Sequence, residues 1–101
     1  MRREPVDNAA LEHWRGLDCL MVLRAFADHV KEDRAFVPRE RLQATRWHVS
    51  AAGFEYELLC TGPRFFDTRA RHGGGSAVDL VMHLFQVDFK HAVALLRHKG
   101  L

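Results

Sequence analysis

The sequence predicts an α+β domain in which a three-stranded antiparallel sheet is flanked by one N-terminal helix and two C-terminal helices. Apolar residues recur at helical spacing near both ends of the chain, they alternate with polar residues in its middle, and the two patterns do not intermix. With 101 residues and 48% hydrophobic composition, the chain has enough apolar material for one compact core. We expect a flexible arm over residues 1–8 and a single domain over residues 9–101.

The first helix is predicted over residues 17–30, because apolar residues repeat there every three or four positions. The residues of this stripe are Leu20, Leu23, Ala27 and Val30. A shorter leading turn is expected before Gly16. The helix is followed by a predicted loop over residues 31–41, in which Pro38 disfavours helical backbone at the preceding residue.

The middle of the chain predicts three antiparallel strands within residues 42–69, because apolar and polar residues alternate there. In the first strand Trp47 and Val49 point inward, so that Arg46 and His48 face outward together. A turn at residues 50–53 connects this strand to the second strand, at residues 54–60. A turn at residues 61–63 then leads to the third strand, at residues 64–69.

Three glycines, Gly73 to Gly75, run directly into a helix that begins at Ser76. Ser76 and Asp79 form an S-x-x-D start signal, in which the serine oxygen accepts a hydrogen bond from a first-turn amide. Two interpretations of the glycines stay open. They permit positive φ and close backbone approach, so that the helix start could bind a phosphate, or they only let the chain turn sharply out of the preceding strand. A last helix is expected over residues 88–99.

Charge and cysteine content indicate the kind of partner and the cellular compartment to expect for this protein. The formal net charge is only +2, but residues 1–33 hold five Lys/Arg against seven Asp/Glu, whereas residues 34–101 hold ten against six. This asymmetry suits an anionic partner better than the total suggests. Cys19 and Cys60 lie far apart and outside any C-x-x-C motif, which favours a reduced chain in the cytoplasm. We expect neither a signal peptide nor a membrane span, which needs roughly 18 consecutive apolar residues.

The residues from Gly74 onward carry a resemblance to a known family. Gly-Gly is followed by a helix with Ala-Val-Asp-Leu and Met and then, after a short link, by a helix with Phe-x-x-Ala-Val. The sequence is similar here to the CHC-type zinc-binding domain of bacterial replicative primases, and most of all to metal-poor variants from plasmid and mobile-element proteins. The matching positions are Gly74, Gly75, Ala77, Val78, Asp79, Leu80, Met82, Phe89, Ala92 and Val93. The likeness covers roughly residues 54–99 and implies a zinc-ribbon-like fold.

The chain departs from that family at the metal ligands. Carrying the family register back from Gly74 places two cysteine ligands at Thr68 and Arg71, neither of which binds zinc. The nearby ligand candidates are too loosely spaced for a structural zinc site, and they are Cys60, His72 and His48. We therefore expect no metal and no other cofactor.

Apolar side chains would replace the metal at the centre of the fold, chiefly Trp47, Phe65 and Phe66. The remaining histidines lie at no useful ligand spacing and are expected on helix surfaces. They are His13, His29, His83, His91 and His98.

The sequence predicts a binding module rather than an enzyme, because adjacent elements offer no Ser/His/Asp, Cys/His or paired-carboxylate arrangement. Since the primase domain contacts template DNA, the resemblance implies a nucleic-acid-binding module, with single-stranded DNA favoured, in the replication or transfer of a plasmid or other mobile element. The predicted nucleic-acid-binding residues are Arg46, His48, Arg64, Phe66, Arg69, Arg71, His72, Gly73, Gly74, Gly75 and Ser76.

Two alternatives stay open at this stage. An aromatic residue of the sheet, Phe66 or Tyr56, would stack a base if it is exposed and would belong to the core if it is buried. The whole chain could instead be a protein-interaction adaptor that docks on a primase, helicase or recombinase partner, a role that the acidic first helix would suit.

Overall fold

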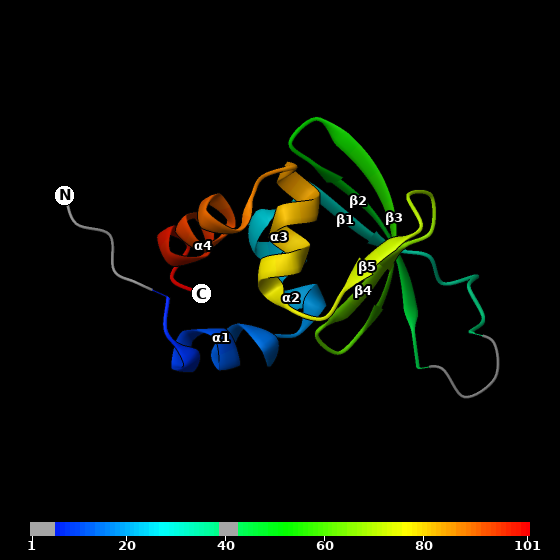
Figure 1. The fold of residues 1–101 in the computed structure, drawn as a ribbon. Coiled ribbons are helices and arrows are strands. Elements are labelled where there is room, and N and C mark those ends of the chain that lie inside the picture. The colour runs from blue at the N-terminus through cyan, green and yellow to red at the C-terminus, as the bar shows by residue number, and fades with distance from the viewer. Residues whose placement is uncertain (1–5, 39–42) are drawn as a thin grey trace.

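The computed structural model describes residues 6–38 and 43–101, which form two N-terminal helices, a five-stranded antiparallel sheet and two C-terminal helices (Figure 1). The helices are α1 (Asn8–Arg15), α2 (Cys19–Phe26), α3 (Ala77–Phe85) and α4 (Phe89–His98). The strands are β1 (His29–Glu32), β2 (Thr45–Ala51), β3 (Phe54–Thr61), β4 (Arg64–Asp67) and β5 (His72–Gly74). Neighbours pair in the order β1-β2-β3-β4-β5, so the sheet is a continuous meander.

This architecture confirms the predicted α+β class, the antiparallel pairing of β2, β3 and β4, and the two C-terminal helices. The sheet is wider than the predicted three strands, because β1 and β5 add one strand at each edge. The N-terminal part contains two helices, separated at Gly16, instead of the one predicted. Of the expected arm, residues 1–5 lie outside the described residues, and Asn8 is already the first residue of α1. No helix in the described residues is long and apolar enough to cross a membrane.

The predicted helix over residues 17–30 is wrong beyond Phe26. The backbone becomes extended at Ala27, with ψ of 148°, and Val30 lies in β1 opposite Val49 of β2. Val30 fits the helical stripe by its spacing, but a stretch of four residues is too short for periodicity to separate helix from strand. Pairing with β2, which is distant in sequence, decides the conformation.

All four helices begin at a side chain that accepts a hydrogen bond from a backbone amide of the first turn. These capping residues are Asp7, Asp18, Ser76 and Asp88. The start predicted at Ser76 is confirmed, with the serine oxygen accepting from the Asp79 amide at 3.2 Å.

The four helices lie on one side of the sheet, here called the inner face, and α2 and α3 contact its strands (Figure 1). The central helix is α3, which contacts α1, α2, α4 and β5. Tyr56 of β3 donates its hydroxyl to the Leu84 carbonyl of α3 at 2.8 Å, which ties this helix to the sheet. The inner face contributes buried side chains to the core, among them Trp47, Val49, Tyr56, Leu58, Cys60 and Phe65. The opposite face, here called the outer face, is not covered by any helix of the described residues.

One charged residue is buried in the described part of the chain: Asp67, with 4% of its surface exposed. Its Oδ1 accepts hydrogen bonds from the backbone amides of Arg69 and Ala70, both at 3.0 Å, and its Oδ2 lies 2.7 Å from Nε2 of His83. Burial raises the pKa of Asp67, but the hydrogen bonds from Ala70, His83 and Arg69 outweigh burial and lower it below 3.8. Because the ionised carboxylate only accepts, His83 donates from Nε2. Asp67 thus ties the β4–β5 turn to α3.

Replacing Asp67 with alanine should lower the free energy of unfolding at pH 7 by about 2 to 4 kcal/mol, because two backbone amides and His83 lose their acceptor. The matched control is Asp88→Ala, which removes an exposed helix cap and should cost about 1 kcal/mol. Urea denaturation of the wild-type protein and of the two variants measures both losses in the free energy of unfolding.

The contribution of Asp67 should also depend on pH. The pKa of Asp67 is lower in the folded protein than in the unfolded chain, so its stabilisation is complete above the unfolded value and is lost as the pH falls through the folded value. The difference in stability between wild type and Asp67→Ala should therefore shrink below about pH 4. A difference that stays constant down to about pH 2.5 would show that the charge of this carboxylate does not stabilise the fold.

Candidate nucleic-acid interface

Side chains from four strands meet on the outer face of the sheet. The register places His48 opposite Lys31 and Glu57, and it places Phe66 between Leu59 and Gly73. Cross-strand partners point to the same side of a sheet, so one surface collects residues of β1 to β4. Its side chains include Lys31, Arg46, His48, Glu55, Glu57, Leu59, Arg64 and Phe66. Arg46 and His48 share this face, as the alternation predicts.

Arg46 is already paired with carboxylates on this face. Its Nε and one terminal nitrogen lie 2.9 and 2.6 Å from Asp33 Oδ2, and its other terminal nitrogen lies 3.6 Å from Glu57 Oε1. The guanidinium also lies over the ring of Phe36, 4.9 Å from its centroid. The hydrogen bond from Arg46 lowers the pKa of Asp33, which therefore stays ionised at neutral pH. A phosphate would reach Arg46 only by displacing Asp33.

Phe66 is exposed and Tyr56 is buried, which separates the two aromatic candidates. Phe66 keeps 43% of its surface accessible, although the sequence also offered it as a replacement for the metal in the core. That interpretation of Phe66 is wrong, whereas Trp47 and Phe65 are buried as expected. A Cβ on Gly73 would lie 3.0 Å from Phe66 Cδ2, so the ring leans over this glycine. The missing side chain at Gly73 leaves room for the Phe66 ring.

The remaining predicted cations do not form one continuous patch. Arg64 and Arg69 flank the two ends of β4 on the exposed surface, and Arg69 lies 3.9 Å from Glu57 Oε2. Arg71 is exposed in the β4–β5 turn and has a left-handed backbone, with φ of 55°. His72 belongs to the other side of the sheet, where its ring lies 5.3 Å from that of His83. Arg64 and Arg69 are thus exposed at the two ends of the strand that carries Phe66.

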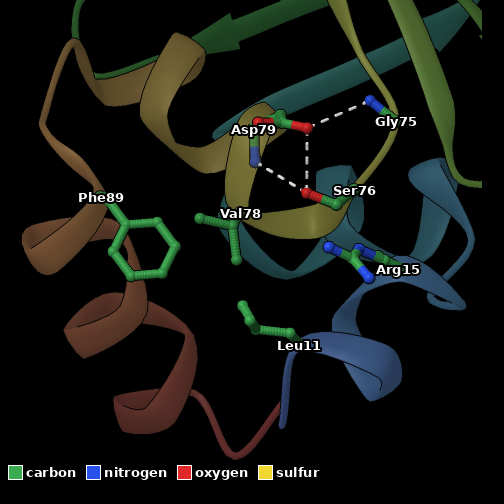
Figure 2. A pocket seen from close by; sticks show the side chains of 7 residues that line it. All are labelled: Leu11, Arg15, Gly75, Ser76, Val78, Asp79 and Phe89. Atoms are coloured by element: carbon green, nitrogen blue, oxygen red, sulfur yellow. Dashed lines mark hydrogen bonds between the residues drawn. The ribbon is translucent and has the colours of Figure 1, made fainter. Parts of the chain in front are cut away.

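The junction between the glycines and α3 is closed by its own carboxylate (Figure 2). Asp79 Oδ2 accepts hydrogen bonds from the Gly75 amide at 3.2 Å and from the Ser76 hydroxyl at 3.1 Å, while the Ser76 oxygen accepts from the Asp79 amide. The helix dipole favours this negative charge at the first turn. A phosphate at this position would have to displace Asp79 and would meet its repulsion.

Close packing rather than unusual backbone conformation explains Gly73 and Gly74, whereas an added Cβ at Gly75 would meet no atom within 4 Å. Positive φ among the described glycines occurs at Gly53, Gly62 and Gly100, and not in the run from 73 to 75. A Cβ on Gly74 would lie 2.5 Å from the Asp79 Cβ and 2.9 Å from a ring atom of Phe65. The geometry therefore supports the close approach expected of these glycines and not the positive φ.

A pocket of about 340 Å³ lies beside the same junction, between α1, α3 and α4 (Figure 2). Leu11, Val78 and Phe89 provide its apolar wall, and the Arg15 guanidinium lies near Ser76. Arg15 also pairs with Glu12 at 3.1 Å. The sequence did not single out this pocket, because its three helices meet only in the folded chain.

The structure does not bring the metal-ligand candidates together. His48 lies on the outer face, whereas Cys60 lies on the inner face with its Sγ 3.0 Å from Cys19 Sγ. Among the described residues, no group of three or more His, Cys, Asp or Glu side chains could hold a metal ion. The predicted surface position of His83 is wrong, since its side chain is 9% exposed and contacts Asp67. No local signal marks His83, because its partner lies in another element.

Comparison of the chain with protein-family models, with curated proteins and with solved structures finds no match.

Gly74→Ala should lower the free energy of unfolding by about 1 to 3 kcal/mol, because its Cβ would overlap the Asp79 side chain and the Phe65 ring. Gly75→Ala is the matched control, since no atom lies within 4 Å of its added Cβ, and it should change stability by no more than about 0.5 kcal/mol. Thermal and urea denaturation measure the stability of the two variants relative to wild type. Equal losses would mean that close packing is not what requires glycine at position 74.

Proposed function

We propose that this chain is a non-catalytic module that binds single-stranded nucleic acid, with DNA favoured, across the outer face of its sheet. The observation that carries the proposal is Phe66, which is exposed on the open face two residues after Arg64 in the same strand. Proteins that bind single strands without sequence preference combine aromatic rings, on which bases stack, with cations that contact the phosphates. Phe66 and Arg64 offer both groups side by side.

The neighbours of Phe66 leave its ring accessible to a base. Gly73 lies beneath one side of the ring, and Leu59 is its partner on the other strand. Side chains two residues apart on a strand are about 7 Å apart. The Arg64 guanidinium can therefore contact a phosphate next to a base that stacks on Phe66.

The carboxylates on the outer face set the expected strength and character of binding. Glu57 lies near Arg46 and Arg69, so two of the cations there already have a counter-charge. A phosphate that replaces this counter-charge gains less than one that meets an unpaired cation. We therefore expect moderate, salt-sensitive binding with little sequence preference, because phosphate contacts do not read bases.

The resemblance to the primase zinc-binding domain supports a place in the replication or transfer of a plasmid or other mobile element, beside replication proteins. In the family register, the two missing ligands fall at Thr68 and Arg71, which lie in and at the end of the β4–β5 turn. Here that turn is held by Asp67 and His83. This arrangement is compatible with a zinc-ribbon-like fold in which the hydrogen bonds of Asp67 hold the turn in place of a metal.

A protein-interaction adaptor is the second candidate function, and a different surface favours it. Phe89 is 44% exposed beside Leu11 and Val78 in the pocket between the helices. An apolar side chain of a primase, helicase or recombinase partner could insert there. The two functions use opposite layers of the molecule, so variants can separate them.

Phe66→Ala should weaken binding of a fluorescent oligothymidylate by about 5- to 150-fold, which corresponds to the loss of one stacked base. The matched control is Phe89→Ala, because the two phenylalanines are almost equally exposed and lie on different layers. Fluorescence anisotropy at low salt measures the three dissociation constants. Equal affinity of Phe66→Ala and wild type would remove the basis of the proposal, and a loss confined to Phe89→Ala would move binding to the helical pocket.

The double variant Arg64→Ala/Arg69→Ala should weaken binding by a similar factor for every oligonucleotide sequence. It should also flatten the slope of log affinity against log salt by about 1.4, since each phosphate contact on a single strand contributes about 0.7. Arg15→Ala/Lys90→Ala removes the same charge from the exposed surface of α1 and α4 and should leave the slope nearly unchanged. An equal change in both variants would indicate a general charge effect instead of contacts at the outer face.

A further inference from the structure

We propose that Cys19 and Cys60 are a redox-active pair that closes to an intramolecular disulfide when the protein meets a disulfide oxidant such as oxidised glutathione. The pair lies in the core, away from the outer face, so this inference does not rest on the proposed function. The spacing of the two cysteines does not reveal this pair, because 41 positions separate them.

The fold places the two sulfur atoms in contact. Cys19 is the first residue of α2, Cys60 lies on the inner face of β3, and their Sγ atoms are 3.0 Å apart. A disulfide bond is about 2.05 Å long, so each sulfur has to move by only a fraction of an ångström. Rotation about the side-chain bonds supplies such a movement without a change of fold.

The backbone on both sides of the pair is held in place. The Cys19 amide donates to the Gly62 carbonyl at 2.8 Å, and Gly62 lies two residues after Cys60. This hydrogen bond fixes the start of α2 against the β3–β4 turn. The two thiols therefore remain neighbours through side-chain motion, which favours their reaction with each other over reaction with a second protein molecule.

Burial makes the reaction depend on a local opening. Both cysteines are buried, and both are free thiols in this structure. The hydrogen bond to Cys60 and burial raise the pKa of the Cys19 thiol, so little thiolate is present while the core is closed. Mild urea raises the population of locally open states, which would admit the oxidant. The reaction should be slow in buffer and faster in mild urea.

The chemistry is thiol–disulfide exchange in two steps. One cysteine loses its proton to solvent, and its thiolate attacks a sulfur of oxidised glutathione, which forms a mixed disulfide and releases one glutathione thiolate. The second cysteine loses its proton and attacks the protein sulfur of the mixed disulfide, which releases the other glutathione. Two protein thiols are oxidised, and one glutathione disulfide is reduced to two thiols.

The cross-link would join α2 to β3 and restrict the unfolded chain. Closing a loop of this length in the unfolded state is one of the larger stabilising effects that a single covalent bond provides. We therefore expect the oxidised protein to melt about 10 °C or more above the reduced one.

The test is to incubate wild-type protein with oxidised glutathione in mild urea at low protein concentration, and then to remove both. The proposal expects a monomer that has lost the mass of two hydrogen atoms, shows no free thiol after denaturation, and melts at a higher temperature until dithiothreitol restores the original value. Cys19→Ser and Cys60→Ser should each end as a mixed disulfide with glutathione.

Three results would overturn the proposal: two free thiols after the incubation, a wild-type chain that retains glutathione as the serine variants do, or a cross-linked protein that melts below the reduced form. The mass and the thiol count are taken on the wild-type chain. They decide the question whether or not the serine variants fold.

Discussion

The hydrogen bonds of Asp67 are the interaction on which the arrangement of this fold depends. They join the end of β4, the turn before β5 and the last part of α3, which is the helix that contacts all the others. Side chains alternate along a strand, so holding Asp67 against the inner face turns Phe66 to the outer face. The buried carboxylate of Asp67 and the exposed ring of Phe66 thus both follow from the direction of β4.

Much of the fold could be predicted because its signals are local. The alternation in β2 and β3 and the cap residues at Ser76 and Asp88 act within a few positions of the chain. The edge strands could not be predicted in this way. β1 follows a helical stripe without interruption and forms because β2, which is distant in sequence, offers hydrogen bonds. β5 contains two glycines, which disfavour a strand, and forms by pairing with β4.

Local sequence patterns likewise predicted some features of the candidate site and could not predict others. The pattern of β2 indicated that Arg46 and His48 would share one side, because period-two spacing fixes direction, whereas it left the direction of Phe66 open. It could not indicate that Asp33 folds back onto Arg46, or that Asp79 occupies the amides at the glycine junction. Such pairings depend on loop paths, and they decide how many of the cations are available to a ligand.

The two edges of the sheet have a consequence for how this molecule can associate. An exposed edge strand presents unpaired backbone groups that can pair with another chain and start aggregation. Here the edge strands have only four and three residues, and β1 carries the charges of Lys31 and Glu32. Short edges, one of which is charged, limit growth of the sheet by a second copy. Contact with another molecule would therefore be made by side chains on the surface of the domain rather than by backbone groups at a sheet edge.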